Sequence, residues 1–318
     1  MLMVINQITD FQIVRRYVFL VIEDIYKVVS CGHMLHEKYN QKTKFLVFVC
    51  LSAAMVAGLS SGTYFTSANA QNKTSMEPTG IGNTITNATK INIVLVHGLW
   101  ADASSWSKVI PILQDAGDKV IAVELPLHSA ADDVATVKRA IDLVGGPVIL
   151  VGHSYGGFVI TNAGYNNPNV KGLVYVAAFA PRESQPLSTF HNVPKEFEGK
   201  PVLIFDKGGF AYINPAIFHD FFVQDADQAQ AKVLAVVQKP ANISGLVNVK
   251  SGPPAWKQLP TWYEVSEYDH VIPPALERMF AKQMNATTIA LPSSHASLVS
   301  HPAEIAQLIL NATKGISK

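Results

Sequence analysis

One serine between glycines is the residue of this chain best placed to do chemistry. Ser154 is the third residue of the pentapeptide GHSYG at 152–156, a G-x-S-x-G sequence that directly follows the apolar run 148–151. Glycines near the serine permit a tight, strained turn, which holds its hydroxyl out above the end of a strand. Such short sequences arise by chance. Here a predicted strand precedes the motif and a plausible helix follows it at 158–164. This context favours Ser154 as a nucleophile over a serine in a structural turn.

A serine hydroxyl is a weak nucleophile near neutral pH, so an adjacent base must take its proton. His295 lies just after the predicted strand 287–291 and before the last predicted helix. This position puts it at the same edge of the sheet as Ser154, and we predict it as the base. Five other histidines fit less well, because they lie in loops, in the serine turn or at the start of a helix: His128, His153, His191, His219 and His301.

The base in turn needs an acid that holds its ring in place. Asp269 directly follows the predicted strand 261–265, and Glu267, two residues earlier, is its closest competitor. Asp206 also follows an apolar run, but it falls in a segment expected to form a cap. With Asp269 the chain order is Ser, Asp, His, which is the order that accompanies the G-x-S-x-G turn. We therefore predict Asp269 as the acid.

Attack by a serine also requires hydrogen-bond donors for the oxyanion that develops on the substrate. The backbone N–H of Tyr155, the residue after the serine, is one candidate, and the helix that begins there adds a favourable dipole. The second donor should come from the loop after the first strand. We predict the N–H of Leu99, because Gly98 allows the chain to turn back toward the serine. His97, in the same loop, is interpreted as a structural hydrogen-bonding residue.

Strands and helices alternate along residues 91–318, which is typical of a mostly parallel sheet with helices on both faces. Apolar runs of strand length predict six strands, at 91–96, 119–124, 147–151, 170–177, 261–265 and 287–291. Helices are predicted at 131–144, 274–284 and 302–311. The first helix has apolar residues at helical spacing and two aspartates in its first turn. The sequence therefore predicts an α/β fold.

One long segment, 181–257, interrupts the alternation and is rich in aromatic residues and proline. We predict an inserted helical cap over the carboxyl edge of the sheet, which leaves 91–180 and 258–318 as the core. Ligands of open α/β sheets bind at that edge, where a cap would shape the pocket. An insertion without such a role is the alternative. The residues expected to contact substrate are Trp100, His153, Phe210 and Phe222.

The first seventy residues differ in character from the rest. Two lysines precede the apolar run 45–59, and a stretch of small and polar residues ends at Ala70. This order is typical of a secretory signal peptide, with cleavage expected after Ala70 and export to the periplasm or the medium. The apolar run is shorter than the roughly 20 residues of a membrane-spanning helix. Met34 is a more natural start than residue 1, so 1–33 is either an upstream extension or a segment that interferes with processing.

Export would leave residues 71–318, of which 71–90 are polar and aperiodic and are expected to form a flexible lead-in. Both cysteines, Cys31 and Cys50, fall in the part expected to be removed, so the mature chain would have neither a disulfide nor a thiol nucleophile. The net charge of the whole chain is +1 and no basic patch is visible, which argues against a nucleic-acid partner. We expect no stable membrane anchoring of the mature form. The oligomeric state is not predicted.

Together these motifs resemble the α/β-hydrolase-fold serine hydrolases over essentially all of 91–313. Within that family the sequence is similar to the lidded esterases of the methylesterase and hydroxynitrile-lyase type. The resemblance is carried by VLVHG at 94–98 with Trp106 downstream, GHSYGG at 152–157, VYVAAFAP at 174–181, DHVIPP at 269–274 and SH at 294–295. Two positions depart from the lyase members: Ala296 stands where they have a lysine, and Gly98 where they have a threonine. Both departures favour ester hydrolysis over cyanohydrin cleavage.

The expected activity is hydrolysis of small apolar or aromatic carboxylic esters through an acyl-enzyme. Neither a metal nor a cofactor is expected, since the sequence has no H-x-H-x-D-H or H-E-x-x-H cluster. A lactonase or a cofactor-free perhydrolase with the same three residues is the alternative among enzymes, and a hydroxynitrile lyase ranks below both. A catalytically silent binding protein of the same fold is the alternative that is not an enzyme.

Overall fold

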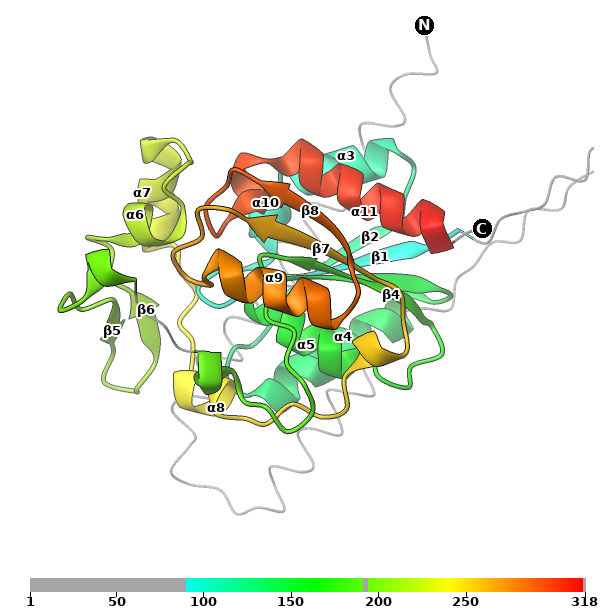
Figure 1. Ribbon diagram of the computed structural model, residues 1–318, viewed down its shortest axis with the longest axis horizontal. Helices are drawn as coiled ribbons and strands as arrows, with labels where there is room; N and C mark the ends of the chain where they lie inside the picture. Colours follow the sequence, from blue (N-terminus) through cyan, green and yellow to red (C-terminus); the bar gives the residue numbers. More distant parts are fainter. Residues whose placement is uncertain (1–89, 191–193, 317–318) are drawn as a thin grey trace, which may run out of the picture. The chain divides into compact units, whose positions relative to one another are not determined.

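The computed structural model describes residues 90–190 and 194–316, in which six parallel strands form one sheet (Figure 1). The strand order is β2-β1-β3-β4-β7-β8. The bounds are β1 Asn92–Val96, β2 Val120–Val123, β3 Val148–His153, β4 Val170–Val176, β7 Thr261–Ser266 and β8 Thr287–Leu291. The six predicted strands are confirmed. The predicted signal peptide with its cleavage after Ala70, the extension 1–33 and the lead-in up to residue 89 lie outside the described residues.

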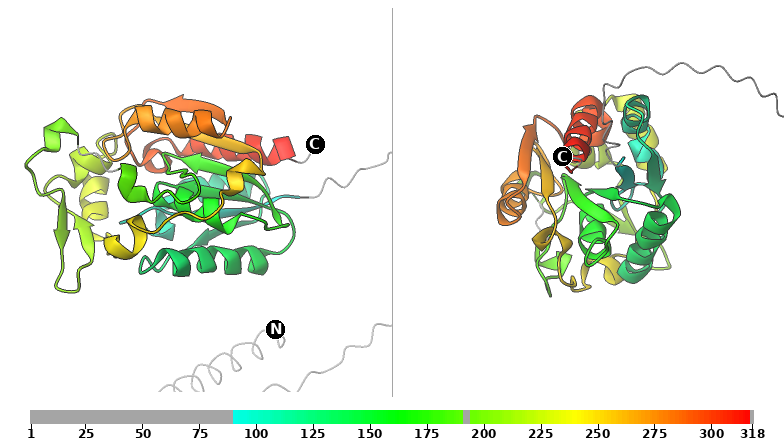
Figure 2. Two further views of the ribbon diagram at one scale, coloured as in Figure 1. Left: turned by 60° about the horizontal axis from the view of Figure 1, so that its bottom comes forward. Right: turned by 90° about the vertical axis from the view of Figure 1, so that its right-hand side faces the viewer.

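Helices cover both faces of this sheet because its strands are apolar on both sides. They are α3 Val109–Asp115 and α11 Pro302–Ile316 on one face, and α4 Ala130–Val144, α5 Tyr155–Ala163 and α9 Pro274–Gln283 on the other (Figure 1, Figure 2). In β3, Ile149 and Val151 pack on the side of α3 and α11, whereas Leu150 packs on the side of α4 and α5. Burial on both sides explains why β3 is a continuous apolar run in the sequence up to Gly152.

Between β4 and β7 the chain leaves the sheet and forms the segment predicted as a cap. It contains the helices α6 Phe218–Phe222, α7 Gln228–Val236 and α8 Ile243–Val247. It also contains an antiparallel hairpin of β5 Leu203–Phe205 and β6 Ala211–Ile213, which was not predicted. At the left of Figure 1 the hairpin, α6 and α7 lie beyond the arrowhead of β7, so the cap stands at the carboxyl edge of the sheet.

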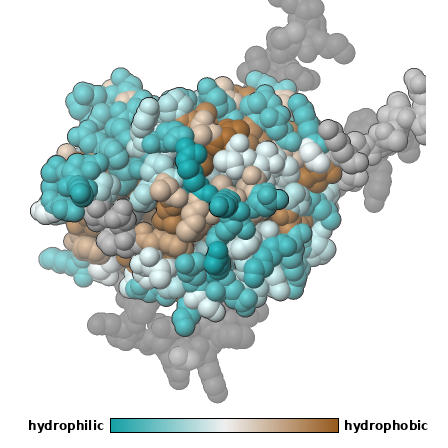
Figure 3. All heavy atoms as spheres, viewed as in Figure 1, coloured by the Kyte–Doolittle hydropathy of each residue, from teal (hydrophilic) through white to brown (hydrophobic). Residues whose placement is uncertain are grey.

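The surface of the described part is mainly hydrophilic on the face shown in Figure 3, where apolar side chains gather in separate patches. None of the helices between residues 90 and 316 that the structure describes is long and apolar enough to cross a membrane.

The carboxyl ends of β1 and β3 lie side by side at the point where the order of the strands in the sheet reverses. From β1 the chain passes to β2 on one side, whereas β3 lies on the other side of β1. Val96 of β1 pairs with Gly152 of β3, so the loops that follow the two strands begin at the same level. Ligands of open α/β sheets bind in a crevice at such a point. The loop 97–99 and the turn at Ser154 are therefore the first place to search for a site.

Candidate active site

Ser154 stands in a strained turn between β3 and α5. Its backbone φ is +53°, in the left-handed region that residues with a Cβ atom rarely adopt. The turn leaves no room for a Cβ atom at the glycines on either side. A Cβ at Gly152 would lie 2.6 Å from the carbonyl oxygen of Gly156, and one at Gly156 would lie 2.5 Å from the carbonyl oxygen of Val96. Both glycines are thus required by close backbone approach.

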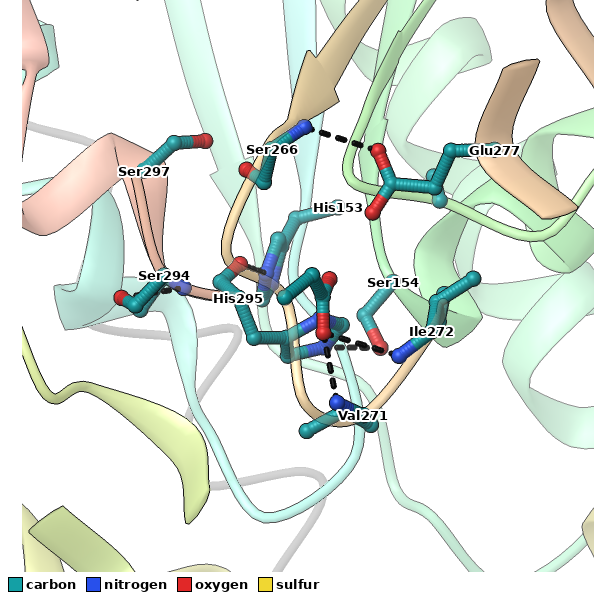
Figure 4. Close-up of polar contacts among 12 residues, drawn as sticks. His153, Ser154, Ser266, Val271, Ile272, Glu277, Ser294, His295 and Ser297 are labelled. Atoms are coloured by element: carbon teal, nitrogen blue, oxygen red, sulfur yellow. Dashed lines mark hydrogen bonds and ion pairs between the residues drawn. The ribbon is translucent and has the colours of Figure 1, made fainter. Parts of the chain in front are cut away.

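The three side chains proposed from the sequence to act together lie in one hydrogen-bonded chain. Nε2 of His295 is 2.8 Å from Oγ of Ser154, and Nδ1 of the same ring is 2.5 Å from Oδ2 of Asp269 (Figure 4). The side chains of His295 and Asp269 are fully buried. A carboxylate only accepts, so Nδ1 carries the proton and donates it to Asp269. Nε2 therefore has a lone pair directed at the serine hydroxyl.

The loop after β7 fixes the orientation of Asp269. Its Oδ1 accepts two backbone N–H groups of the following loop, at 2.6 and 2.8 Å, which leaves Oδ2 to face His295. The two competing acids lie elsewhere. Glu267 forms a surface ion pair with an arginine, and Asp206 accepts backbone N–H groups within the turn of the β5–β6 hairpin. Of the three acids considered from the sequence, Asp269 is the one in contact with the histidine.

The backbone groups considered for an oxyanion site lie beside Ser154. Tyr155 is the first residue of α5, so its N–H has no acceptor within the helix. The loop after β1 approaches the serine very closely, because a Cβ at Gly98 would lie 2.6 Å from Cβ of Ser154 and 3.2 Å from its Oγ. Leu99 follows Gly98 directly and is buried. The two candidate donors thus belong to two segments that both adjoin Ser154, the loop after β1 and the start of α5.

His97 fixes the loop after β1, as the sequence analysis proposed. Its buried ring is 2.8 Å from the carbonyl oxygen of Gly98 at Nδ1, and Nε2 accepts the N–H of Leu125 at 3.0 Å. Because a carbonyl only accepts, Nδ1 carries the proton. Burial lowers the pKa of His97, which keeps the ring neutral and suited to one donated and one accepted bond.

A small cavity of about 40 Å³ lies between the loop after β1 and the cap. Of the four residues expected to contact substrate, Trp100, His153 and Phe222 line it. Phe210 does not line it, because the ring packs against His128 with 5.4 Å between the ring centroids. Trp100 also joins the loop to the cap, since its Nε1–H donates to the carbonyl oxygen of Ala211 in β6 at 3.1 Å.

His153 also supports the backbone of His295. Its Nε2 is 2.9 Å from the carbonyl oxygen of His295 and therefore donates, whereas Nδ1 is buried and has no partner within the part of the chain that the structure describes. Burial and the neighbouring His295 hold the pKa of His153 well below its usual value, so the ring is neutral. Phe222 of α6 packs edge-on against His295, with 5.0 Å between the ring centroids.

An aspartate of the cap, which the sequence analysis did not single out, holds the loop that carries His295. Oδ2 of Asp225 accepts the N–H of Ser294 at 2.9 Å and the hydroxyls of Ser293 at 3.0 Å and Ser300 at 2.7 Å. Burial opposes ionisation of this carboxyl, but these hydrogen bonds outweigh it and lower the pKa of Asp225. The cap therefore takes part in positioning His295.

Two buried glutamates near Asp269 were also not predicted from the sequence as part of the site. Glu264 of β7 accepts the hydroxyls of Ser266 at 2.9 Å and Ser297 at 2.8 Å, and burial raises the pKa of Glu264 to about 7. Glu277 of α9 accepts the backbone N–H of Ser266 at 2.9 Å (Figure 4). Charged residues on a helix are usually solvated, so nothing in the sequence marks Glu277 as buried.

Comparison with known proteins gives the family. A family model described as "Alpha/beta hydrolase family" matches residues 93–308, which is more than half of the chain. The chain belongs to the alpha/beta hydrolase family. The family and the fold class predicted from the sequence are thereby confirmed.

Several relatives of this alpha/beta hydrolase are named as esterases or hydrolases. A carbendazim hydrolyzing esterase from Nocardioides sp. (strain SG-4G) is 35% identical over 109 residues, which are 30% of this chain and 45% of the relative. The chain thus spans just under half the length of that relative. A pyrethroid hydrolase from Sphingobium wenxiniae (strain DSM 21828 / CGMCC 1.7748 / JZ-1) is 26% identical over 247 residues, which are 70% of this chain and 87% of the relative.

A solved structure supports the same architecture. The crystal structure of the methylesterase protein MES16 from Arabidopsis has a TM-score of 0.61 and 18% sequence identity with this alpha/beta hydrolase. The similarity covers 71% of this chain and 99% of that chain. At this identity the likeness shows the fold alone.

Proposed function

We propose that this alpha/beta hydrolase is a carboxylic-ester hydrolase that forms a covalent acyl-enzyme on Ser154. The observation that carries the proposal is the hydrogen-bonded chain from Ser154 through His295 to Asp269, at 2.8 and 2.5 Å. A hydroxyl, an imidazole and a carboxylate linked in this order are what activates a serine as a nucleophile. Esterases among the relatives support the same reaction class.

The proposed reaction has two steps that use the same groups. Nε2 of His295 takes the proton of Ser154 while Oγ attacks the ester carbonyl carbon, and Asp269 stabilises the imidazolium. The carbonyl oxygen becomes an anion and is bound by the N–H groups of Leu99 and Tyr155. The bond to the alcohol oxygen then breaks, and His295 gives its proton to that oxygen. Water, deprotonated by His295, attacks the acyl-enzyme and releases the carboxylic acid.

The side chains around the serine favour an apolar or aromatic ester of modest size. Trp100, Phe222 and Leu298 are among the groups that line the cavity between the loop after β1 and the cap, which His153, the residue before Ser154, also lines. Export by the predicted signal peptide would place the reaction in the periplasm or outside the cell.

The test compares the purified wild-type protein with Ser154→Ala on a panel of aryl esters, alkyl esters and acyl lactones. Ser154→Ala is expected to keep its fold and to lose about 10⁶-fold in kcat, because the nucleophile is gone. A fluorophosphonate should label the wild type and not the variant. Substantial ester turnover by Ser154→Ala would mean that the nucleophile lies elsewhere. Labelling of Ser154 without turnover of any ester would contradict the reaction class, and turnover of lactones alone would contradict the substrate class.

A further inference from the structure

A buried acid next to Asp269 has no place in the mechanism above, and its surroundings are unusual. Glu277 of α9 is 0% exposed, and its Oε2 accepts the backbone N–H of Ser266 at 2.9 Å (Figure 4). Its other oxygen, Oε1, is buried and has no hydrogen-bond donor among residues 90–190 and 194–316. A buried carboxylate oxygen without a donor is costly, so an ionised Glu277 would be poorly accommodated here.

The group that Glu277 does meet is another acid. Its side chain lies near Asp269, close enough for the two carboxyls to act on each other electrostatically. Two ionised carboxylates present only acceptors and repel each other. A single proton between them turns the pair into a donor and an acceptor. This proton would satisfy Oε1 of Glu277 and remove the repulsion.

The neighbours of Asp269 indicate that this residue is the ionised member of the pair. Its Oδ1 accepts the N–H groups of Val271 at 2.6 Å and Ile272 at 2.8 Å, and its Oδ2 accepts from Nδ1 of His295 at 2.5 Å. Three donors directed at one carboxyl stabilise its negative charge. Glu277 accepts a hydrogen bond from one donor, so a negative charge on Glu277 would be stabilised far less than one on Asp269.

The neighbours of Glu277 favour its neutral form. Burial, followed by the charges of Asp269 and Glu264, raises the pKa of Glu277 well above its usual value. The Tyr263 hydroxyl on β7 also faces it, and burial and the nearby carboxyls, Glu277 first among them, keep that hydroxyl protonated by raising its pKa. None of these groups supplies a positive charge that would favour ionisation of Glu277.

We propose that Glu277 is a positioning residue, a neutral carboxylic acid whose Oε1–H donates a hydrogen bond to Asp269 and holds that carboxylate toward His295. The proposal rests on the function proposed above, because it assigns a partner to the acid of that site. The proton stays on Glu277 through both steps of the reaction, and Asp269 stays ionised. Glu277 touches neither the substrate nor Ser154, so it acts on kcat and leaves KM unchanged.

The first test uses two substitutions in the full chain and a nearby control. Glu277→Gln keeps a donor in place of Oε1–H and an acceptor for the N–H of Ser266, so kcat at pH 7 should stay close to the wild-type value. Glu277→Leu removes both and should lower kcat by about 10²-fold at unchanged KM, because Asp269 loses its orientation. The control is Glu267→Gln, which removes a partly exposed acid of the loop after β7 that pairs with Arg278, and it should change neither constant.

The pH profile separates a neutral donor from a merely structural residue. In the wild type, ionisation of Glu277 at alkaline pH sets two negative charges side by side, so kcat should fall there. Glutamine cannot ionise, so Glu277→Gln should keep its activity to higher pH than the wild type. Loss of activity by Glu277→Gln as large as that of Glu277→Leu at every pH would overturn the proposal.

A spectroscopic measurement decides the question without any enzyme assay. The infrared difference spectrum of wild type minus Glu277→Gln at pH 7 should contain the C=O stretch of a protonated carboxyl group. A carboxylate band in its place would overturn the proposal, even if Glu277→Leu fails to fold. If the wild type hydrolyses no ester, the proposed function fails, whereas this spectrum still shows whether Glu277 holds the proton.

Discussion

The substitution Gly98→Ala tests how closely the loop after β1 must approach the nucleophile. The added Cβ would lie 2.6 Å from Cβ of Ser154 and 3.1 Å from Nδ1 of His153. Carbon atoms in contact are about 3.5–4.0 Å apart, so the loop must retreat by roughly 1 Å. Leu99 is the next residue and moves with it, so its N–H leaves the position proposed for binding the oxyanion.

The size of the effect follows from that displacement. Loss of one oxyanion donor costs about 10²–10³ in kcat, or ~2.7–4 kcal/mol of transition-state stabilisation. We expect kcat of Gly98→Ala to fall by about 10²-fold with little change in KM, because the oxyanion exists only beyond the ground state. Overpacking of the turn should lower the free energy of unfolding by ~1–3 kcal/mol.

Steady-state hydrolysis of an aryl acetate, with urea unfolding of the same samples, measures both effects. The matched control is Gly199→Ala in the cap, where φ is +72° and no atom lies within 4 Å of the added Cβ. It introduces backbone strain alone and should leave kcat unchanged. A folded Gly98→Ala protein with kcat within about threefold of wild type would refute the close approach and the role given to Leu99.

Three further substitutions, with Glu267→Gln again as a control, test individual groups of the site. Asp269→Asn should lower kcat by about 10⁴-fold, whereas Glu267→Gln should have little effect. The reverse ranking in the same assay would assign the role of the acid to Glu267. Asp225→Asn should lower the free energy of unfolding at pH 7 by ~1–3 kcal/mol, because a charged acceptor of three bonds is lost. Because folding lowers the pKa of Asp225, its ionised carboxyl adds stability above the unfolded pKa near 4, and this contribution is lost as the pH falls through the folded pKa. Urea unfolding at pH 3 should therefore show a smaller difference in stability between the wild type and Asp225→Asn. For Glu264 the pKa rises from 4.5 to about 7 on folding, so wild-type stability relative to Glu264→Gln should fall as pH increases from about 4.5 through 7; a flat difference would contradict the burial argument.

The framework of the site could be predicted from the sequence because the signals that identify it lie in short stretches of the chain. The central strands β1, β3, β4 and β7 are largely buried and mostly apolar, and Ser154 and Asp269 follow two of them, whereas His295 follows β8, a more exposed strand at the edge of the sheet. Parallel strands end at the same edge of a sheet, so residues that follow different strands can be expected to meet. The glycines of the turn add a local steric signal that the positive φ of Ser154 explains.

The parts that were missed depend on contacts between distant segments. Each strand of the β5–β6 hairpin has three residues and the hairpin is partly exposed, with Phe205 61% exposed, so the alternation is too short to identify. Asp225 meets Ser300, which is 75 residues away in the chain. Glu277 lies in the first turn of α9, where an acid is equally well explained by the helix dipole. In both cases the residue type is ordinary and only the folded chain reveals its partner.

The left-handed backbone at Ser154 bears on whether the chain still needs its hydroxyl. A residue with a Cβ atom in a sparsely populated conformation costs of order 1–3 kcal/mol, and glycine would adopt the same backbone with much less strain. In a protein that used this fold for binding alone, replacement of this serine by glycine would relieve the strain and raise the stability, so nothing would oppose the replacement. A serine at this strained position adds nothing to folding, and its hydroxyl is what the proposed nucleophile requires.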